Sequence, residues 1–260
     1  MNIKEIWIHR MRDFESILHS KRKTRVLTYV LLRQIFKLLR LDEKIITKLI
    51  PNNLHELYGL NFISRAKTLD FLFFSKFYEP ETTRFLMNTK GGTFIDVGSH
   101  IGRFALIGSK RFKKVLAFEP HPSNFKSLQR NVEINSIKNI KLVQEAVSDK
   151  PGSLKIGEIG INTGATQISE SGTIIIKANN LDNTLKKYSV KSNEVDLIMI
   201  DAEGYELNVL MGCTRLLKMG KPTLIIECFD LPKVREFLRK YGYENVKQLD
   251  FYNQVFTKKL

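Results

Sequence analysis

The stretch Thr93-Phe-Ile-Asp-Val-Gly-Ser-His-Ile-Gly102 and the segment Val115-Leu-Ala-Phe-Glu-Pro120 together decide the fold. Residues 93–97 are apolar and rich in β-branched side chains, which predicts a buried parallel strand, and Gly98 follows directly. The apolar spacing over 101–108 then predicts a helix. Because a strand runs through a glycine turn into a helix, we expect the free N–H groups at the helix start to face a ligand above the strand end.

The nature of that ligand follows from two acidic residues. Glu119 lies twenty-one residues after Gly98, the spacing at which an acid on the neighbouring strand accepts hydrogen bonds from the ribose hydroxyls of a nucleoside. The patterns G-x-G-x-x-G and G-K-[ST] are absent, and Asp96 stands where the first glycine of a dinucleotide fingerprint would be. A carboxylate there would repel a pyrophosphate but suits a ligand with ammonium and sulfonium groups. We therefore expect S-adenosyl-L-methionine (SAM). The alternative is that Asp96 only caps the turn and Glu119 is an ordinary strand-end charge.

The rest of the chain alternates between strand and helix patterns. Further strands are predicted at 140–147, 195–200 and 223–226, helices at 122–135, 181–188 and 234–240, and a closing hairpin at 243–257. We expect an α/β fold with a doubly wound, mostly parallel seven-stranded sheet, a terminal antiparallel hairpin and helices on both faces.

Three other segments are predicted around this sheet. Residues 54–66 indicate a short strand or hairpin, and residues 69–87 an aromatic helix and turn packed on the sheet. Residues 154–156 and 174–177 predict a hairpin on either side of the loop Gly157–Gly172, which is long enough to cover a substrate.

Composition and charge set the wider limits. The 260 residues carry a net charge of +15, of which residues 1–50 contribute +7. We divide the chain into a basic, amphipathic helical segment (1–53), with two or three helices ending before Pro51, and a catalytic domain (54–260). The basic segment suggests contact with an anionic membrane surface or RNA, and the alternative is a helical cap with solvated charges.

The cysteine content and the N-terminus bear on the cellular location. The chain has two cysteines, no metal-ligand spacing and no signal-peptide pattern. We therefore expect a cytoplasmic protein, with peripheral contact at the inner membrane surface as one alternative.

Several motifs resemble the FkbM-type family of class I SAM-dependent methyltransferases. They are Tyr78-Glu-Pro80, the glycine turn with its strand, Val115–Pro120, Glu145-Ala-Val-Ser-Asp149 and Asp196-Leu-Ile-Met-Ile-Asp-Ala-Glu-Gly-Tyr-Glu-Leu207. The resemblance covers residues 54–258, and its specific part is Asp-x-Glu-Gly-x-Glu. It implies methyl transfer to oxygen, often a hydroxyl of a sugar, polyketide or other natural product.

The candidate site residues follow from these patterns. A hydroxyl acceptor needs a group that removes its proton, and Asp201 and Glu203 at the end of the fourth strand are the candidates. Glu206 is expected to favour the following helix start, and no metal ligand set is assigned. Glu227 is expected either to shape the acceptor pocket or to pair with a nearby base. The candidate cofactor-binding residues are Asp96, Gly98, Ser99, His100, Gly102, Glu119, Pro120, Glu145, Ala146 and Asp201.

Three functions remain open from the sequence. The first is an O-methyltransferase acting on a hydroxyl of a saccharide, glycolipid or related natural product. The second is an RNA methyltransferase that holds nucleic acid with the basic segment, although no Asn/Asp-Pro-Pro-aromatic motif is present. The third is a non-catalytic module that binds SAM.

Overall fold

The computed structural model describes residues 50–259 and, before them, residues 27–28, 30–33 and 47–48. Residues 27–28 and 30–33 are helical and residues 47–48 form a short 3-10 turn. The remainder of the helical segment expected before Pro51 lies outside the described residues.

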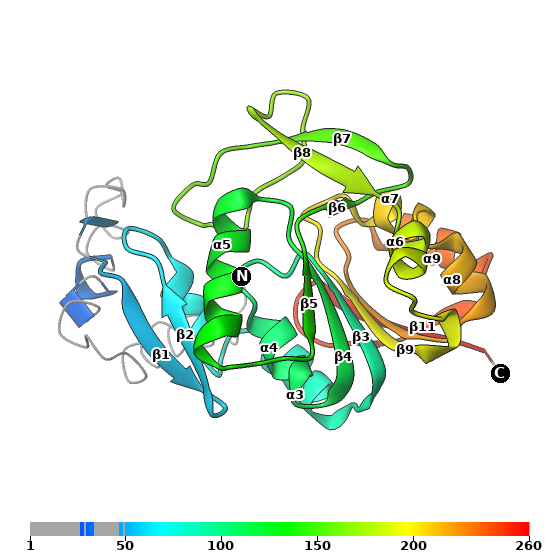
Figure 1. The fold of residues 1–260 in the computed structure, drawn as a ribbon, viewed down its shortest axis with the longest axis horizontal. Coiled ribbons are helices and arrows are strands. Elements are labelled where there is room, and N and C mark those ends of the chain that lie inside the picture. Colours follow the sequence, from blue (N-terminus) through cyan, green and yellow to red (C-terminus); the bar gives the residue numbers. More distant parts are fainter. Residues whose placement is uncertain (1–26, 29, 34–46, 49, 260) are drawn as a thin grey trace.

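A seven-stranded sheet forms the centre of the domain (Figure 1). Its spatial order is β11-β12-β10-β9-β3-β4-β5. Only β12 runs antiparallel to its neighbours, and the other pairings are parallel. The expected fold class is therefore confirmed. The strands are β3 (Gly91–Val97), β4 (Phe112–Phe118), β5 (Ile140–Val143), β9 (Val195–Ile200), β10 (Thr223–Glu227), β11 (Tyr243–Gln248) and β12 (Asn253–Lys258).

Helices cover both faces of this sheet (Figure 1). Alternate residues of β3 point to opposite faces, so Phe94 packs with one cluster of buried side chains and Ile95 with the other. The Phe94 face carries α3 (Pro80–Asn88), α4 (Arg103–Ser109) and α5 (Pro122–Ile134), and the Ile95 face carries α6 (Leu181–Lys187), α7 (Glu206–Met211), α8 (Thr214–Met219) and α9 (Leu231–Arg239). Burial on both faces explains why the central strands are continuously apolar.

The segment expected as one strand at 140–147 is two strands in different sheets. Val143 pairs with Phe118, the last residue of β4, so the chain beyond it has no neighbour on that side. It turns away at Gln144 and Glu145 and resumes as β6 (Ala146–Val147). With β7 (Gly152–Ile156) and β8 (Ile174–Asn179) it forms a small sheet in the order β6-β8-β7, and β7 and β8 lie above the large sheet in Figure 1.

The N-terminal part of the domain matches its expected elements in outline. The hairpin of β1 (Asn53–Leu57) and β2 (Leu60–Ser64) forms around Gly59 and lies beside α5 (Figure 1). The aromatic segment at 69–87, expected as a helix and turn, contains two helices, the 3-10 helix η2 (Asp70–Phe74) and α3. Pro80 has no N–H to donate, so it is tolerated at the start of α3 but not within a longer helix. None of the helices that the structure describes combines the length and apolarity needed to cross a bilayer.

Candidate active site

The glycine turn brings the ends of β3, β4 and β9 into close contact. The backbone N–H groups of Gly98 and Ser99 both donate to the carbonyl oxygen of Phe118, at 3.0 and 2.8 Å. Gly98 has φ of +85°, and a Cβ on it would lie 1.7 Å from the backbone oxygen of Asp201. Only glycine fits this position, because both the backbone angle and the space exclude a side chain.

Glu119 lies against the turn. Its Oε2 accepts from the backbone N–H of His100, and its Oε1 accepts from the backbone N–H of His121, both at 2.8 Å. Burial raises the pKa of Glu119 to about 7. A carboxylate has about four acceptor sites, so two remain for the hydroxyls of a ribose.

A cavity of about 320 Å³ opens above these strand ends. This volume is in the range of small-molecule sites. The predicted cofactor-binding or catalytic residues that line it are Gly98, Ser99, His100, Glu119, Pro120, Glu145, Ala146, Asp201 and Glu203. The structure thus brings together predicted residues from four segments of the chain.

Two predicted cofactor-binding residues do not line this cavity. Asp96 is 2% exposed, and its carboxyl lies near Ser99 and the start of α4. Gly102 precedes α4 with φ of +96°, and a Cβ there would meet the side chains of Leu106 and Leu128. Both residues shape the turn, and their contact with a cofactor stays a prediction.

The cavity fits an adenosyl group. Gly98 provides the close backbone approach and Glu119 provides the acceptors for a sugar. The Oε2 atom of Glu145 is buried and has no hydrogen-bond partner among the described residues, so it can accept from an exocyclic amine. These three residues would hold the ribose and adenine of SAM.

A cluster of three acidic side chains lies at the cavity, with Asp201 and Glu203 in its lining and Glu227 next to them. Asp201 follows β9, Glu203 lies in the next turn with φ of +51°, and Glu227 ends β10. One carboxylate oxygen from each lies within 4.8 Å of the others. These three carboxyl groups, all among the described residues, could hold a divalent cation, since Mg²⁺ prefers carboxylate oxygens.

Crowding and burial keep these acids partly protonated. Burial, followed by the charge of Glu227, raises the pKa of Asp201 well above its usual range. Burial raises the pKa of Glu227 to about 7, and burial together with the charge of Asp201 raises that of Glu203 to about 7. Two carboxyl groups this close retain one proton between them near neutral pH, so the cluster can take up and release a proton in that range.

Glu79 lies in the Tyr78-Glu-Pro80 motif, but no role was predicted for it from the sequence. Burial, then the charges of Asp201 and Asp250, raises the pKa of Glu79 to about 8. Its Oε2 accepts from Asn253 Nδ2 at 2.8 Å, and Tyr78 lines the cavity beside it. In the sequence, only the motif pointed to Glu79 and Tyr78, because both residues are far from Asp201 along the chain.

The loop Gly157–Gly172 is tied to the cavity by Thr163. Thr163 Oγ1 donates to Asp70 Oδ1 at 2.6 Å, so His100 Nε2, 2.7 Å away, is assigned as the donor to Thr163 Oγ1. Burial lowers the pKa of His100 to about 4, so its ring is neutral. Asn162, Gly164, Thr166 and Ile168 of the loop line the cavity. The ring of His100 therefore faces the loop, and the backbone N–H of His100 faces Glu119.

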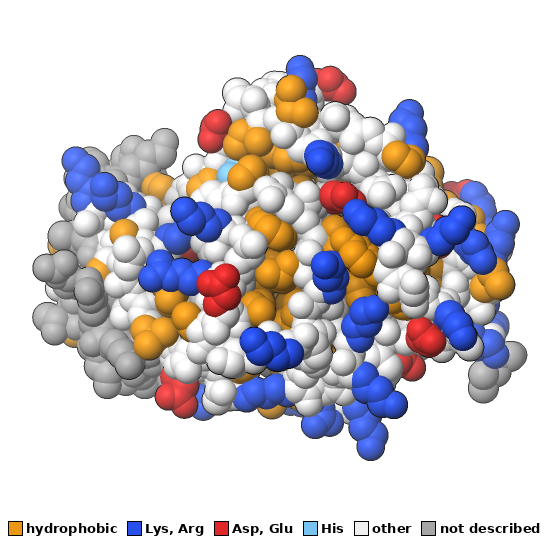
Figure 2. Space-filling model, viewed as in Figure 1, with side chains coloured by type: hydrophobic (Ala, Val, Ile, Leu, Met, Phe, Trp, Pro, Cys, Tyr) orange, Lys and Arg blue, Asp and Glu red, His pale blue; other side chains and the backbone are white. Residues whose placement is uncertain are grey.

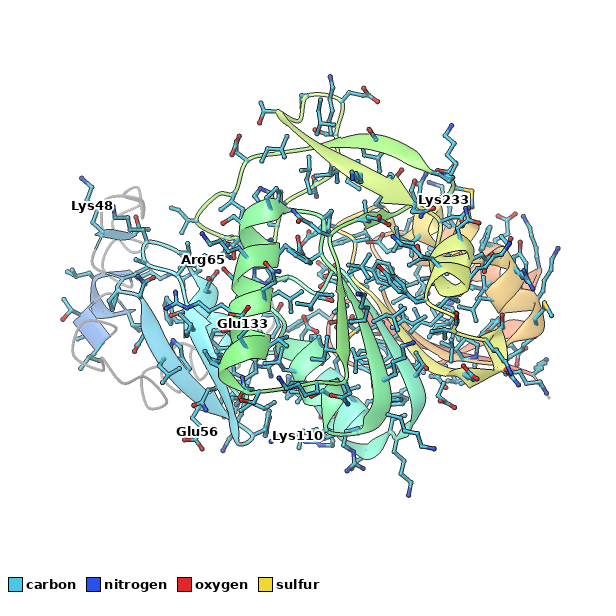
Figure 3. The ribbon with its side chains drawn as sticks, viewed as in Figure 1. Lys48, Glu56, Arg65, Lys110, Glu133 and Lys233 are labelled. Atoms are coloured by element: carbon cyan, nitrogen blue, oxygen red, sulfur yellow. The ribbon has the colours of Figure 1, made fainter. Side chains whose placement is uncertain are left out.

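Arg65 extends this network to the start of α5. Its guanidinium pairs with Asp70, with Nε 2.7 Å from Oδ2, and its Nη2 donates to Asn124 Oδ1 at 2.9 Å. Asn124 Nδ2 in turn donates to the backbone oxygen of Thr163 at 3.1 Å. Figure 3 labels Arg65 beside the upper end of α5. The loop, η2 and α5 are thus held by one set of buried hydrogen bonds.

Three other residues have structural positions. Glu206 Oε1 accepts from the backbone N–H of Gly204 at 2.8 Å, which agrees with the expected role at a helix start. Cys213 and Cys228 are both free and buried, which is typical of thiols in a protein core.

Comparison with known families identifies the chain. The family described as the methyltransferase FkbM domain matches residues 96–244, more than half of the chain. The chain belongs to the FkbM methyltransferase family. This confirms the resemblance and supports SAM as the cofactor.

Individual relatives of this FkbM methyltransferase are distant. The hexuronic acid methyltransferase AglP of Haloferax volcanii is 32% identical over 124 residues, covering 47% of this chain and 50% of its own length. Methyltransferase 1 of Beauveria bassiana is 26% identical over 141 residues, covering 45% of this chain and 57% of its own. The chain therefore spans little more than half the length of these curated relatives. A solved FkbM methyltransferase from Methylobacillus flagellatus KT aligns with a TM-score of 0.47 and 18% identity, over 64% of this chain and 43% of the other.

Proposed function

We propose that this protein is an O-methyltransferase that transfers a methyl group from SAM to a hydroxyl of a saccharide, glycolipid or related natural product. The observation that carries the proposal is a group of three acids, in which Asp201 and Glu203 line the cavity and Glu227 lies next to them. At least two of the three have a pKa of about 7. Such a group is suited to remove a proton from an alcohol at neutral pH.

The chain's own residues divide the work between two ends of the cavity. Bound SAM supplies an electrophilic methyl group on a sulfonium. Glu119 and Glu145 hold the nucleoside end, and Gly98 permits the close approach of β3 and β9 that places Asp201 next to the turn. The loop residues around Thr163 cover the cavity and exclude water.

At the acceptor end, a proton must leave the hydroxyl because an alcohol is a weak nucleophile while protonated. We assign its removal to Asp201 or Glu203, and a positioned base of this kind contributes about 10²–10⁴-fold in rate. Glu227 and Asp201 share one proton, so the pair can take up or release a proton near neutral pH.

The acceptor class is supported by one relative. The Haloferax volcanii protein is called a hexuronic acid methyltransferase, which is consistent with a sugar as acceptor. The match covers half of that protein, so the saccharide remains part of our proposal and its identity is the subject of the experiment below.

The experiment is to incubate the purified chain with methyl-labelled SAM and with separate glycan, lipid and RNA fractions. We expect label in the glycan or glycolipid fraction. The variants Asp201→Asn and Glu203→Gln should lose most of the transfer, whereas Glu133→Gln, an exposed glutamate on α5 labelled in Figure 3, should behave as the parent. Label in no hydroxyl-bearing fraction, with SAM bound, would contradict the proposal and favour a binding module.

A second candidate, RNA methylation, is favoured by one specific observation. Lysine and arginine side chains are scattered over the face seen in Figure 2 with few acidic ones among them. Around Tyr188, the ammonium groups of Lys141 and Lys187 lie 5.1 and 5.3 Å from the ring centre, and Lys114 Nζ donates to the Tyr188 backbone oxygen. Retention of RNA that falls steeply with salt, together with label in the RNA fraction, would support this candidate.

A further inference from the structure

Three exposed aromatic side chains lie together on the carboxyl edge of the sheet. Phe229 and Tyr252 are each 52% exposed and Phe251 is 44% exposed. Every other Phe and Tyr that the structure describes is buried or half-buried. Exposed apolar groups that cluster in this way usually mark a place where something binds.

The aromatic residues stand directly beside the acidic cluster. Phe229 follows Glu227 by two residues, in the loop between β10 and α9. Tyr252 ends the turn between β11 and β12, and its backbone oxygen accepts from the N–H of Cys228 at 2.9 Å. The rings of Phe229 and Tyr252 lie 5.1 Å apart at an interplanar angle of 34°. The two loops thus place an aromatic pair next to the strand end that carries Glu227.

Hydrogen-bond acceptors lie on the inner side of this pair. Asn253, the residue after Tyr252, pairs in register with Glu227 and donates to Glu79. The Oε2 atom of Glu227 is buried and has no hydrogen-bond partner among the described residues. An aromatic surface therefore adjoins a set of carboxyl groups that still have capacity to accept.

We propose that Phe229 and Tyr252 form the acceptor subsite and that they bind the C–H face of an uncharged pyranose. This inference rests on the proposed O-methyltransferase function and names its acceptor more narrowly. The ring C–H groups of a sugar carry partial positive charge and suit the negative face of an aromatic ring. The hydroxyls at the sugar's edge are donors for the adjoining carboxyl groups, Glu227 and Glu79 among them.

The charge of the subsite decides between sugar acceptors and nucleic acid. A base could also stack on these rings, but its phosphates would lie near Asp201, Glu203 and Glu227, and like charges at short range disfavour the complex. The same argument disfavours the carboxylate of a hexuronic acid at this position. An uncharged sugar meets no such penalty.

The first test separates acceptor binding from donor binding. With the glycan that wild type labels as substrate, Phe229→Ala and Tyr252→Ala should each raise KM by about 2–10-fold, the size of a lost aromatic contact, and leave the Kd of SAM unchanged. Tyr252→Phe keeps the ring and should keep the parent KM. Val246→Ala, on exposed β11 surface away from the loops, is the control and should do the same.

The second test reports binding directly. The single tryptophan, Trp7, is replaced by Phe and Phe229→Trp is introduced, so that all tryptophan emission comes from position 229. Methyl β-glucopyranoside should change this emission in a saturable way, and methyl β-glucuronide at equal concentration should not.

The outcomes distinguish failure of the acceptor subsite from failure of the proposed methyltransferase function. Wild-type transfer to a glycan with parent KM in both alanine variants, or an equal emission response to the glucuronide, would overturn the subsite while the methyltransferase proposal stands. If wild type binds SAM but labels no glycan at all, the proposed function fails and the subsite falls with it.

Discussion

Replacing Gly98 with alanine tests whether the contact between β3 and β9 builds the site. The added Cβ would lie 1.7 Å from the Asp201 backbone oxygen, and real Cβ contacts essentially never fall below 3.0 Å. The two strand ends would therefore have to part by roughly 1.3 Å in a close-packed region. The positive φ of +85° adds about 1–2 kcal/mol for a residue with a side chain. A displacement of about 1 Å in a catalytic group costs about 100-fold in rate.

The assay combines SAM titration calorimetry, initial rates of methyl transfer and the thermal midpoint. We expect Gly98→Ala to weaken SAM and to lower turnover by about 100-fold or more. Gly242→Ala is the matched control, since Gly242 has a similar φ of +79° but its nearest neighbouring atoms lie at 3.9 Å, at the start of β11. It carries the backbone strain without the collision and should keep parent activity. If Gly98→Ala binds SAM and turns over like the parent, the contact does not set the site and the reasoning is refuted.

Three further changes probe the proton, the loop and the buried charge. Asp201→Asn should lower the transfer rate by about 10²–10⁴-fold with little change in thermal midpoint, and a parent rate in the folded variant would remove Asp201 from the mechanism. Thr163→Val leaves Asp70 and His100 short of one partner each, so stopped-flow measurement should show faster SAM release; an unchanged rate would mean that the loop is held elsewhere. For Glu79, a folded-state pKa of about 8 against an ordinary 4.5 means that the folded protein keeps a proton that the unfolded chain releases, so wild-type stability falls as pH rises between these values. The free energy of unfolding of Glu79→Gln minus that of wild type, measured with urea, should therefore be about 1–3 kcal/mol larger at pH 8.5 than at pH 5. An equal difference between the two proteins at both pH values would contradict this prediction.

Local patterns were enough to predict the order of the elements. Continuous apolar runs marked β3, β9 and β10, because strands buried on both faces need apolar side chains at every position. The prediction for 140–147 was wrong in one respect, since no local signal shows that β4 ends opposite Val143 and leaves the chain without a partner. The seven-stranded sheet and the hairpin of β7 and β8 could be predicted, but the pairing of β6 with β8 could not.

The donor end of the site was also accessible from the sequence. Gly98 and Glu119 lie on consecutive strands that are neighbours in the sheet, so their spacing along the chain fixes their spacing in the structure. Whether the Asp96 side chain lines the cavity could not be predicted, because the direction of a side chain at a strand end depends on how the turn leaves the sheet. The burial of Asp96 beneath that turn is a property of the packed structure.

The sequence by itself determined the strand, the glycine turn and the ribose acid, since these depend on residues within one unit of strand, turn and helix. Only the tertiary structure decided which carboxyl groups meet Asp201, which residue of the loop contacts His100 and where the exposed aromatic rings gather. Glu79 and Glu227 reach Asp201 from separate segments, Glu227 because β10 lies next to β9 in the sheet. The raised pKa values arise from that proximity and burial, which is why they could not be obtained from the order of the residues alone.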